Sequence, residues 1–160
     1  MANGVWVMRM RNGYLAGLCC CLVLGLGGCS SLGFGPSVKL QAATLDVVSM
    51  ANDDTPLAVD FVAVKDPELH KLLLGLPAAK WFEQREQLRR DYPVDLKVWE
   101  LELVPGQHLE TEDVPIRGEP AAGLLVYAGY AGPGMHRLSL DTRKKVWLRF
   151  ESKNMRLMEP

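Results

Sequence analysis

The chain has no cysteine after residue 29, and all four of its cysteines lie between residues 19 and 29. Neighbouring cysteines in a run cannot converge on a tetrahedral zinc ion, which needs separated pairs. A disulfide framework is excluded as well, because no distant cysteine is available as a partner. The folded part of the chain must therefore be stabilised by its apolar core.

The chain also lacks an excess of charge and any recognisable catalytic motif. It has 18 basic and 19 acidic residues, with a formal net charge of −1, and no basic stripe that would indicate a nucleic-acid partner. The sequence contains no nucleophile elbow, phosphate loop, zinc-protease helix or dinucleotide-binding glycine pattern. His108 and Glu110 would share a strand face, but no third type of ligand residue lies nearby in the sequence. We therefore expect no enzyme, no catalytic residue, no metal, no cofactor and no small-molecule substrate.

An N-terminal targeting signal is predicted over residues 1–28. Two arginines precede an apolar run at 15–26, which is too short and too rich in glycine to span a membrane as a mature helix. The run ends in Leu-Gly-Gly-Cys, where the cysteine is Cys29. This order resembles the lipobox of bacterial lipoproteins, which implies cleavage before Cys29 and lipidation of that residue. The alternatives are a secretory signal without lipid and an apolar N-terminal helix in a cytosolic protein.

The same resemblance implies the periplasmic face of the outer membrane as the location. In Gram-negative lipoproteins an aspartate directly after the lipidated cysteine favours the inner membrane, and here that residue is Ser30. Several acyl chains on one cysteine anchor a protein stably, since each buried CH2 contributes about 0.8 kcal/mol. Residues 30–43 are rich in Ser, Gly and Ala and have no sustained period. We expect 29–43 to be a lipidated N-terminus and flexible tether.

Residues 44–160 are predicted to form one mainly β domain. The segments 44–50 and 57–64 are β-branched and roughly alternating. The turn residues between them, Asn52-Asp53-Asp54, predict either a hairpin with an acidic tip or a turn between two strands of a sandwich. Further strands are predicted at 95–104, 108–116, 124–130, 135–140, 145–151 and 154–158. About seven or eight strands favour a two-layer β-sandwich.

A helical insert at about 67–90 interrupts these strands. Asp66 can cap the first helix and Pro67 suits its first position. The second helical stretch, 78–90, has an apolar face around Trp81. The acidic residues of this stretch favour a solvated outer face over a nucleic-acid contact.

Three of the predicted strands have distinctive patterns. The strand at 95–104 has apolar residues in two opposite phases, so we expect a bulge near 98–99. The strand at 108–116 is acidic and ends beside Pro115, which is typical of a sheet edge. The strand at 124–130 is apolar on both faces, as a central strand would be.

The order of these segments resembles the TssJ family, the outer-membrane lipoproteins of the type VI secretion membrane complex. After the lipobox and tether, the resemblance is carried by Val64-Lys65-Asp66 at the end of the second strand, by Leu103-Val104-Pro105-Gly106-Gln107, and by the apolar strand Leu124–Gly129. It covers about residues 44–151. The resemblance implies a transthyretin-like sandwich with a small helical appendage and no catalytic role.

The resemblance also implies a partner and a binding loop. In the family, the loop between the first two strands contacts the periplasmic domain of the large inner-membrane subunit. The matching residues here are Ala51, Asn52, Asp53, Asp54 and Thr55, in a loop shorter than the family's usual one. The residues by themselves are compatible with a docking point on a rigid scaffold and with an ordinary solvated turn.

Three functions therefore compete. The first is a structural lipoprotein that anchors and helps to assemble a secretion complex. The second is a pilotin-like lipoprotein that carries a secretin to the outer membrane, which would require a hydrophobic peptide groove. The third is a periplasmic ligand-binding or inhibitor lipoprotein, which would require a buried pocket.

Overall fold

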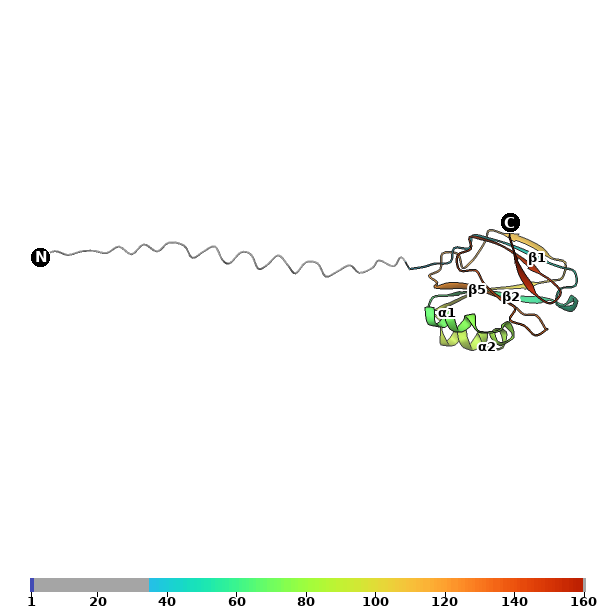
Figure 1. Cartoon of the computed structure of the whole chain (residues 1–160), viewed down its shortest axis with the longest axis horizontal. Coiled ribbons are helices and arrows are strands. Elements are labelled where there is room, and N and C mark those ends of the chain that lie inside the picture. Colours follow the sequence, from blue (N-terminus) through green and yellow to red (C-terminus); the bar gives the residue numbers. More distant parts are fainter. Residues whose placement is uncertain (2–34, 160) are drawn as a thin grey trace. The chain divides into compact units, whose positions relative to one another are not determined.

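The computed structural model describes Met1 and residues 35–159, and it shows two four-stranded sheets with a helical layer (Figure 1). In chain order the elements are β1 (Ala42–Val47), η1 (Ala51–Asp54), β2 (Leu57–Val64), α1 (Pro67–Leu74), α2 (Ala78–Asp91), β3 (Leu96–Leu103), β4 (His108–Thr111), β5 (Gly123–Ala128), β6 (Arg137–Ser139), β7 (Lys145–Phe150) and β8 (Met155–Met158). The strand orders are β4-β1-β7-β8 and β3-β2-β5-β6. The predicted two-layer sandwich is confirmed.

Consecutive strands β1 and β2 lie in different sheets. β1 pairs with β7 in parallel and with β4 in antiparallel orientation, whereas β2 lies between β3 and β5. The residues between β1 and β2 therefore form a turn from one sheet to the other rather than a hairpin. The predicted edge position of β4 and the inner position of β5 are also confirmed.

The main core lies between the two sheets. Alternate residues of β1 and β7, such as Leu45 and Leu148, are fully buried against β2 and β5. Phe61 of β2 stacks on Trp99 of β3, with ring centroids 4.8 Å apart. The strict alternation along β1 and β7 follows from burial on only one face, since successive side chains of a strand point to opposite faces.

A second core lies between the helices and the β3-β2-β5-β6 sheet. The Asp66 side chain accepts a hydrogen bond from the Leu69 N–H at 2.7 Å, and Pro67 occupies the first position of α1, as predicted. Trp81 of α2 is fully buried and stacks on Tyr127, with centroids 4.9 Å apart. In Figure 1 both helices lie on the side of β2 and β5 that faces away from β1.

A buried polar group joins α2 to the sheet beneath it. Asp60 of β2 is fully buried, and its carboxylate accepts hydrogen bonds from Trp81 Nε1 at 2.8 Å and from Arg85 Nη1 at 3.1 Å. Burial raises the Asp60 pKa, and the two donors and the Arg85 charge only partly offset that rise.

The bulge predicted near Val98 and Trp99 does not occur. β3 pairs with β2 without interruption, from Leu57 opposite Leu103 to Val64 opposite Leu96. The two apolar phases of β3 have another cause, because each faces a different core. Trp99 belongs to the core between the sheets, while Val98 packs under the helices.

The sandwich begins before residue 44, where the sequence predicted its start. Val38 and Leu40 are buried in the main core, and Ser37 forms a β-bridge with Pro120. The predicted tether at 29–43 therefore overlaps the folded domain, because apolar residues among its small ones pack into the core. The signal at 1–28 and Cys29 lie outside the described residues. None of the described helices is long and apolar enough to cross a membrane.

Candidate functional site

The loop predicted to bind a partner forms a left-handed turn. Asn52, Asp53 and Asp54 have φ angles of 50°, 55° and 59°. This region of backbone space costs an L-residue roughly 1–2 kcal/mol, and Asn and Asp tolerate it best among non-glycine residues. Three such residues in a row persist only where the surrounding structure holds them.

Asn52 forms several of the hydrogen bonds that stabilise this turn. It is only 7% exposed, and its Nδ2 donates to Thr55 Oγ1 at 2.8 Å and to the Pro56 carbonyl at 3.2 Å. Its Oδ1 accepts from the Ala131 N–H at 2.8 Å, and its own N–H donates to the Ser152 carbonyl at 3.0 Å. One residue thus connects the turn to two other loops.

Tyr130 joins those two other loops to each other. It is buried, and its hydroxyl lies 2.7 Å from the Asn154 carbonyl oxygen and 3.0 Å from that of Glu151. Burial raises the Tyr130 pKa, and the charge of Glu151 raises it further, so the hydroxyl remains a donor at neutral pH. We call the three connected segments, residues 48–56, 129–136 and 151–154, the loop platform.

The loop platform exposes only part of the predicted site. Asp53, Asp54 and Thr55 are exposed, whereas Ala51 is fully buried and Asn52 nearly so. The prediction that Asn52 belongs to an exposed tip is therefore wrong, because its side chain is used inside the turn. Within the described residues, Asp53 and Asp54 have no ion-pair partner, so both charges face solvent.

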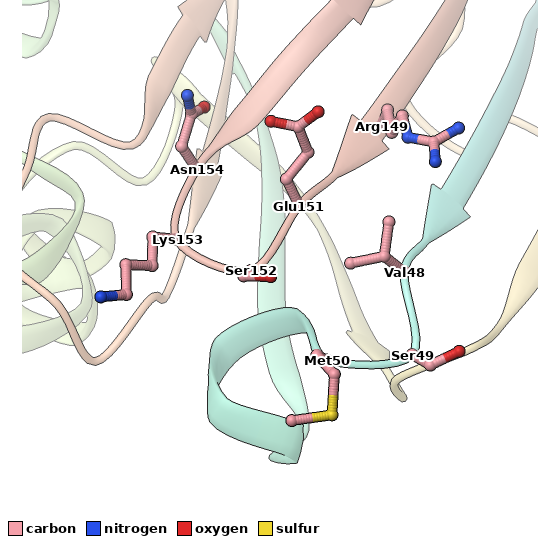
Figure 2. A pocket seen from close by; sticks show the side chains of 8 residues that line it. All are labelled: Val48, Ser49, Met50, Arg149, Glu151, Ser152, Lys153 and Asn154. Atoms are coloured by element: carbon pink, nitrogen blue, oxygen red, sulfur yellow. The ribbon is translucent and has the colours of Figure 1, made fainter.

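An open groove lies beside the turn (Figure 2). Its volume is about 720 Å³, and it separates Met50 from the turn between β7 and β8. Met50 is 62% exposed. The lining residues are Val48, Ser49, Met50, Arg149, Glu151, Ser152, Lys153 and Asn154. Sequence analysis missed this groove because its two sides are about one hundred residues apart in the chain.

The loop platform and residues 35–40 are at opposite ends of the sandwich. Gln41, just before β1, donates its N–H to the Lys144 carbonyl just before β7. Since β1 and β7 run in parallel, both strands then lead toward the loop platform. Figure 1 shows the same arrangement, with η1 far from residues 35–40. The turn therefore points away from the point where the N-terminal segment joins the domain.

His108 and Glu110 lie on the surface of β4. His108 Nε2 is 3.2 Å from Glu110 Oε1, and His108 Nδ1 is 3.8 Å from Asp46 Oδ1 on β1. Among the described residues, no three His, Cys, Asp or Glu side chains are placed to hold a metal ion. These contacts join two strands on the sheet surface.

No family model and no curated protein matches the sequence. Eight chains of solved structures match the fold. The type VI secretion lipoprotein TssJ1 from Pseudomonas aeruginosa is 17% identical, with a TM-score of 0.58 over 74% of this chain and 95% of that one. This chain has a TssJ-like fold. Lip from Serratia marcescens, a membrane-bound component of the type VI secretion system, is 14% identical, with a TM-score of 0.54 over 74% of this chain and 96% of Lip.

A third match belongs to a structure described as the C-terminal domain of the type VI protein TssM from EAEC. It is 12% identical, with a TM-score of 0.53 over 74% of this chain and 97% of that chain. The TssJ-like fold predicted from short sequence segments is thus supported by architecture at very low identity. Packing of two sheets constrains side-chain volume and alternation more than residue identity, so chains of very low identity can share this fold.

Proposed function

We propose that this TssJ-like protein is a non-enzymatic outer-membrane lipoprotein that anchors and helps to assemble the membrane complex of a type VI secretion system. Its partner is the periplasmic domain of the large inner-membrane subunit, which it binds through Asp53, Asp54 and Thr55. The observation that carries this proposal is the loop platform, which holds in a strained turn two carboxylates that have no ion-pair partner among residues 35–159. The names of the matching structures, which include TssJ1, Lip and TssM, support the assignment to this secretion system.

The direction of the turn suits this role. If Cys29 carries the lipid, the linker from Cys29 to the first buried residue, Val38, spans at most about 30 Å. The domain then stays near the outer membrane. Because the loop platform lies at the end opposite to this linker, the two aspartates face the periplasm, where an inner-membrane partner would approach.

The partner contact is tested by removing the two charges. Asp53→Asn/Asp54→Asn keeps side chains that tolerate the left-handed turn. We expect affinity for the isolated periplasmic domain of the candidate subunit to fall by about tenfold or more, and the salt dependence of association to shrink. The matched control is Asp113→Asn/Glu119→Gln, which removes two charges at the opposite end of the sandwich. Equal binding by the two double variants would refute the contact.

The anchor is tested separately with Cys29→Ser. We expect this variant to lose lipid labelling and to leave the outer-membrane fraction, either as soluble periplasmic protein or as uncleaved precursor. Outer-membrane fractionation with normal processing would contradict the proposal. Neither outcome depends on Asp53 or Asp54, so anchor and partner contact are judged independently.

The pilotin-like function ranks second. It requires a hydrophobic peptide groove, and the groove beside η1 has only Val48 and Met50 as apolar lining residues. A binding assay of the wild-type protein with each candidate partner would distinguish the two functions directly. Binding to a secretin subunit, with none to the inner-membrane subunit, would reverse the ranking.

A further inference from the structure

Among residues 35–159, no element covers one face of the sandwich. Both helices lie over the β3-β2-β5-β6 sheet, so within the described residues the outer face of the β4-β1-β7-β8 sheet is open (Figure 1). Trp147 of β7 lies on this open face and is 40% exposed. A large aromatic side chain on an uncovered sheet favours an interaction surface.

The shape of this open face is uneven. In register, Thr44 of β1 lies between Glu110 of β4 and Trp147 of β7. A groove of about 460 Å³ follows β1, with Ala42 and Thr44 among its lining residues. The face thus has a large side chain on one strand and small side chains on the strand next to it.

The charge of the open face is also uneven. Glu110 and Glu112 lie at its β4 edge, while Lys145, Arg149 and Arg156 lie on β7 and β8. Arg149 pairs with Asp46 at 3.1 Å, and Arg156 pairs with Glu151. Glu112 and Lys145 have no ion-pair partner within the described residues, although both line the groove. The β4-β1 half of the face is therefore acidic, and the β7-β8 half is basic.

We propose that the open face packs against the same face of a second copy of this chain, around a twofold axis that runs parallel to the strands between β1 and β7. This axis places β4 and β1 of each copy over β8 and β7 of the other, so that the acidic half of one face meets the basic half of its partner. It also places each Trp147 over the small residues of the other copy's groove. A twofold axis perpendicular to the strands would instead place β4 over β4, with like charges opposed.

The same axis leaves both copies pointing in one direction. Rotation about an axis parallel to the strands preserves strand direction, so the residues just before β1 lie at one end in both copies and both loop platforms lie at the other. Two proteins anchored in the same membrane leaflet need this arrangement. This agreement rests on the proposed lipid anchor, whereas the charge and shape arguments do not.

The size of the face predicts a weak contact. Four strands spaced about 4.8 Å apart and about 20 Å long cover roughly 400 Å² per copy, or about 800 Å² in total. Stable interfaces bury about 1,200 Å² or more. We therefore expect the pair to dissociate in dilute solution and to form when anchoring raises the local concentration.

The test uses the full chain in the membranes of cells that process it. Thr44→Cys places a thiol at the centre of the face, and Glu83→Cys places one on the exposed side of α2. A short bismaleimide is added as cross-linker. The wild-type chain, which has neither introduced cysteine, controls for cross-links through the chain's own cysteines at residues 19–29. We expect cross-linked homodimer from Thr44→Cys at about tenfold or more the level from Glu83→Cys. Equal yields, or an adduct of Thr44→Cys with a different protein, would overturn the proposal.

Charge reversal on the Thr44→Cys background then tests the orientation. Lys145→Glu and Glu112→Lys should each reduce the cross-linked dimer by about tenfold, because each brings like charges together across the axis. The variant with both changes should recover the original yield. Failure of the double variant to recover would overturn the proposed axis. Partner binding through Asp53 and Asp54 is measured in a separate assay, so failure of the proposed function would not be mistaken for failure of this pairing.

Discussion

Replacing Asn52 tests whether the loop platform is held as described. Asn52→Ala removes three side-chain hydrogen bonds, to Thr55, Pro56 and Ala131. Each contributes about 0.5–1.5 kcal/mol. Alanine also tolerates the φ of 50° less well than asparagine, by up to about 1 kcal/mol. The free energy of unfolding should therefore fall by about 2–5 kcal/mol, a large share of the 5–15 kcal/mol typical of a domain.

The measurement is urea unfolding of residues 30–160, followed by tryptophan fluorescence, to which the fully buried Trp81 contributes together with Trp99 and Trp147. With a slope of about 2 kcal/mol per molar urea, the midpoint should fall by roughly 1–2.5 M. Asn52→Gly separates the two terms, because glycine accepts positive φ freely and loses only the hydrogen bonds. Asp53→Asn should leave the midpoint unchanged, since that side chain is exposed. A wild-type midpoint for Asn52→Ala would refute the reasoning.

Three further predictions concern the helical layer. Trp81→Ala should lower the free energy of unfolding by about 3–5 kcal/mol because the ring is fully buried; an unchanged urea midpoint would show that α2 is peripheral. Burial raises the Asp60 pKa. The stability of the wild type relative to Asp60→Asn should therefore increase as the pH falls through that raised pKa toward about 4, and decrease as the pH rises again. The opposite trend, in unfolding curves measured across a pH series, would contradict this assignment. Gly123→Ala should destabilise the protein because a Cβ there would overlap the His70 ring, and its effect should shrink in a His70→Ala background; full additivity of the two changes would show that the residues do not meet.

Local chemistry in the sequence determined several elements correctly. The cap at Asp66 and the proline at Pro67 act within one turn of α1, so neighbouring residues suffice to predict that helix start. The alternation along β7 reports burial on one face only, and it predicted that strand closely. The lipobox-like segment ending at Cys29 is also a local pattern, but it lies outside the described residues, so lipidation there stays a prediction.

Other features depended on contacts between distant segments. The second apolar phase of β3 was interpreted as a bulge, because sequence alone does not show that helices cover its other face. The start of the domain was placed too late for the same reason, since Val38 and Leu40 are recognisable as core residues only when the sheets pack around them.

The candidate site shows most clearly which features follow from the sequence and which depend on the tertiary structure. The sequence alone determined that Asn52, Asp53 and Asp54 form a turn, because these residue types tolerate left-handed backbone. Only the tertiary structure decided that Asn52 faces inward, since its partners include Ala131 and Ser152, about eighty and one hundred residues away. Hydrogen bonds over such separations have no periodic signal in the sequence. The packing of the three loops therefore determines which polar side chain stabilises the turn. It also determines which two charged side chains the turn exposes.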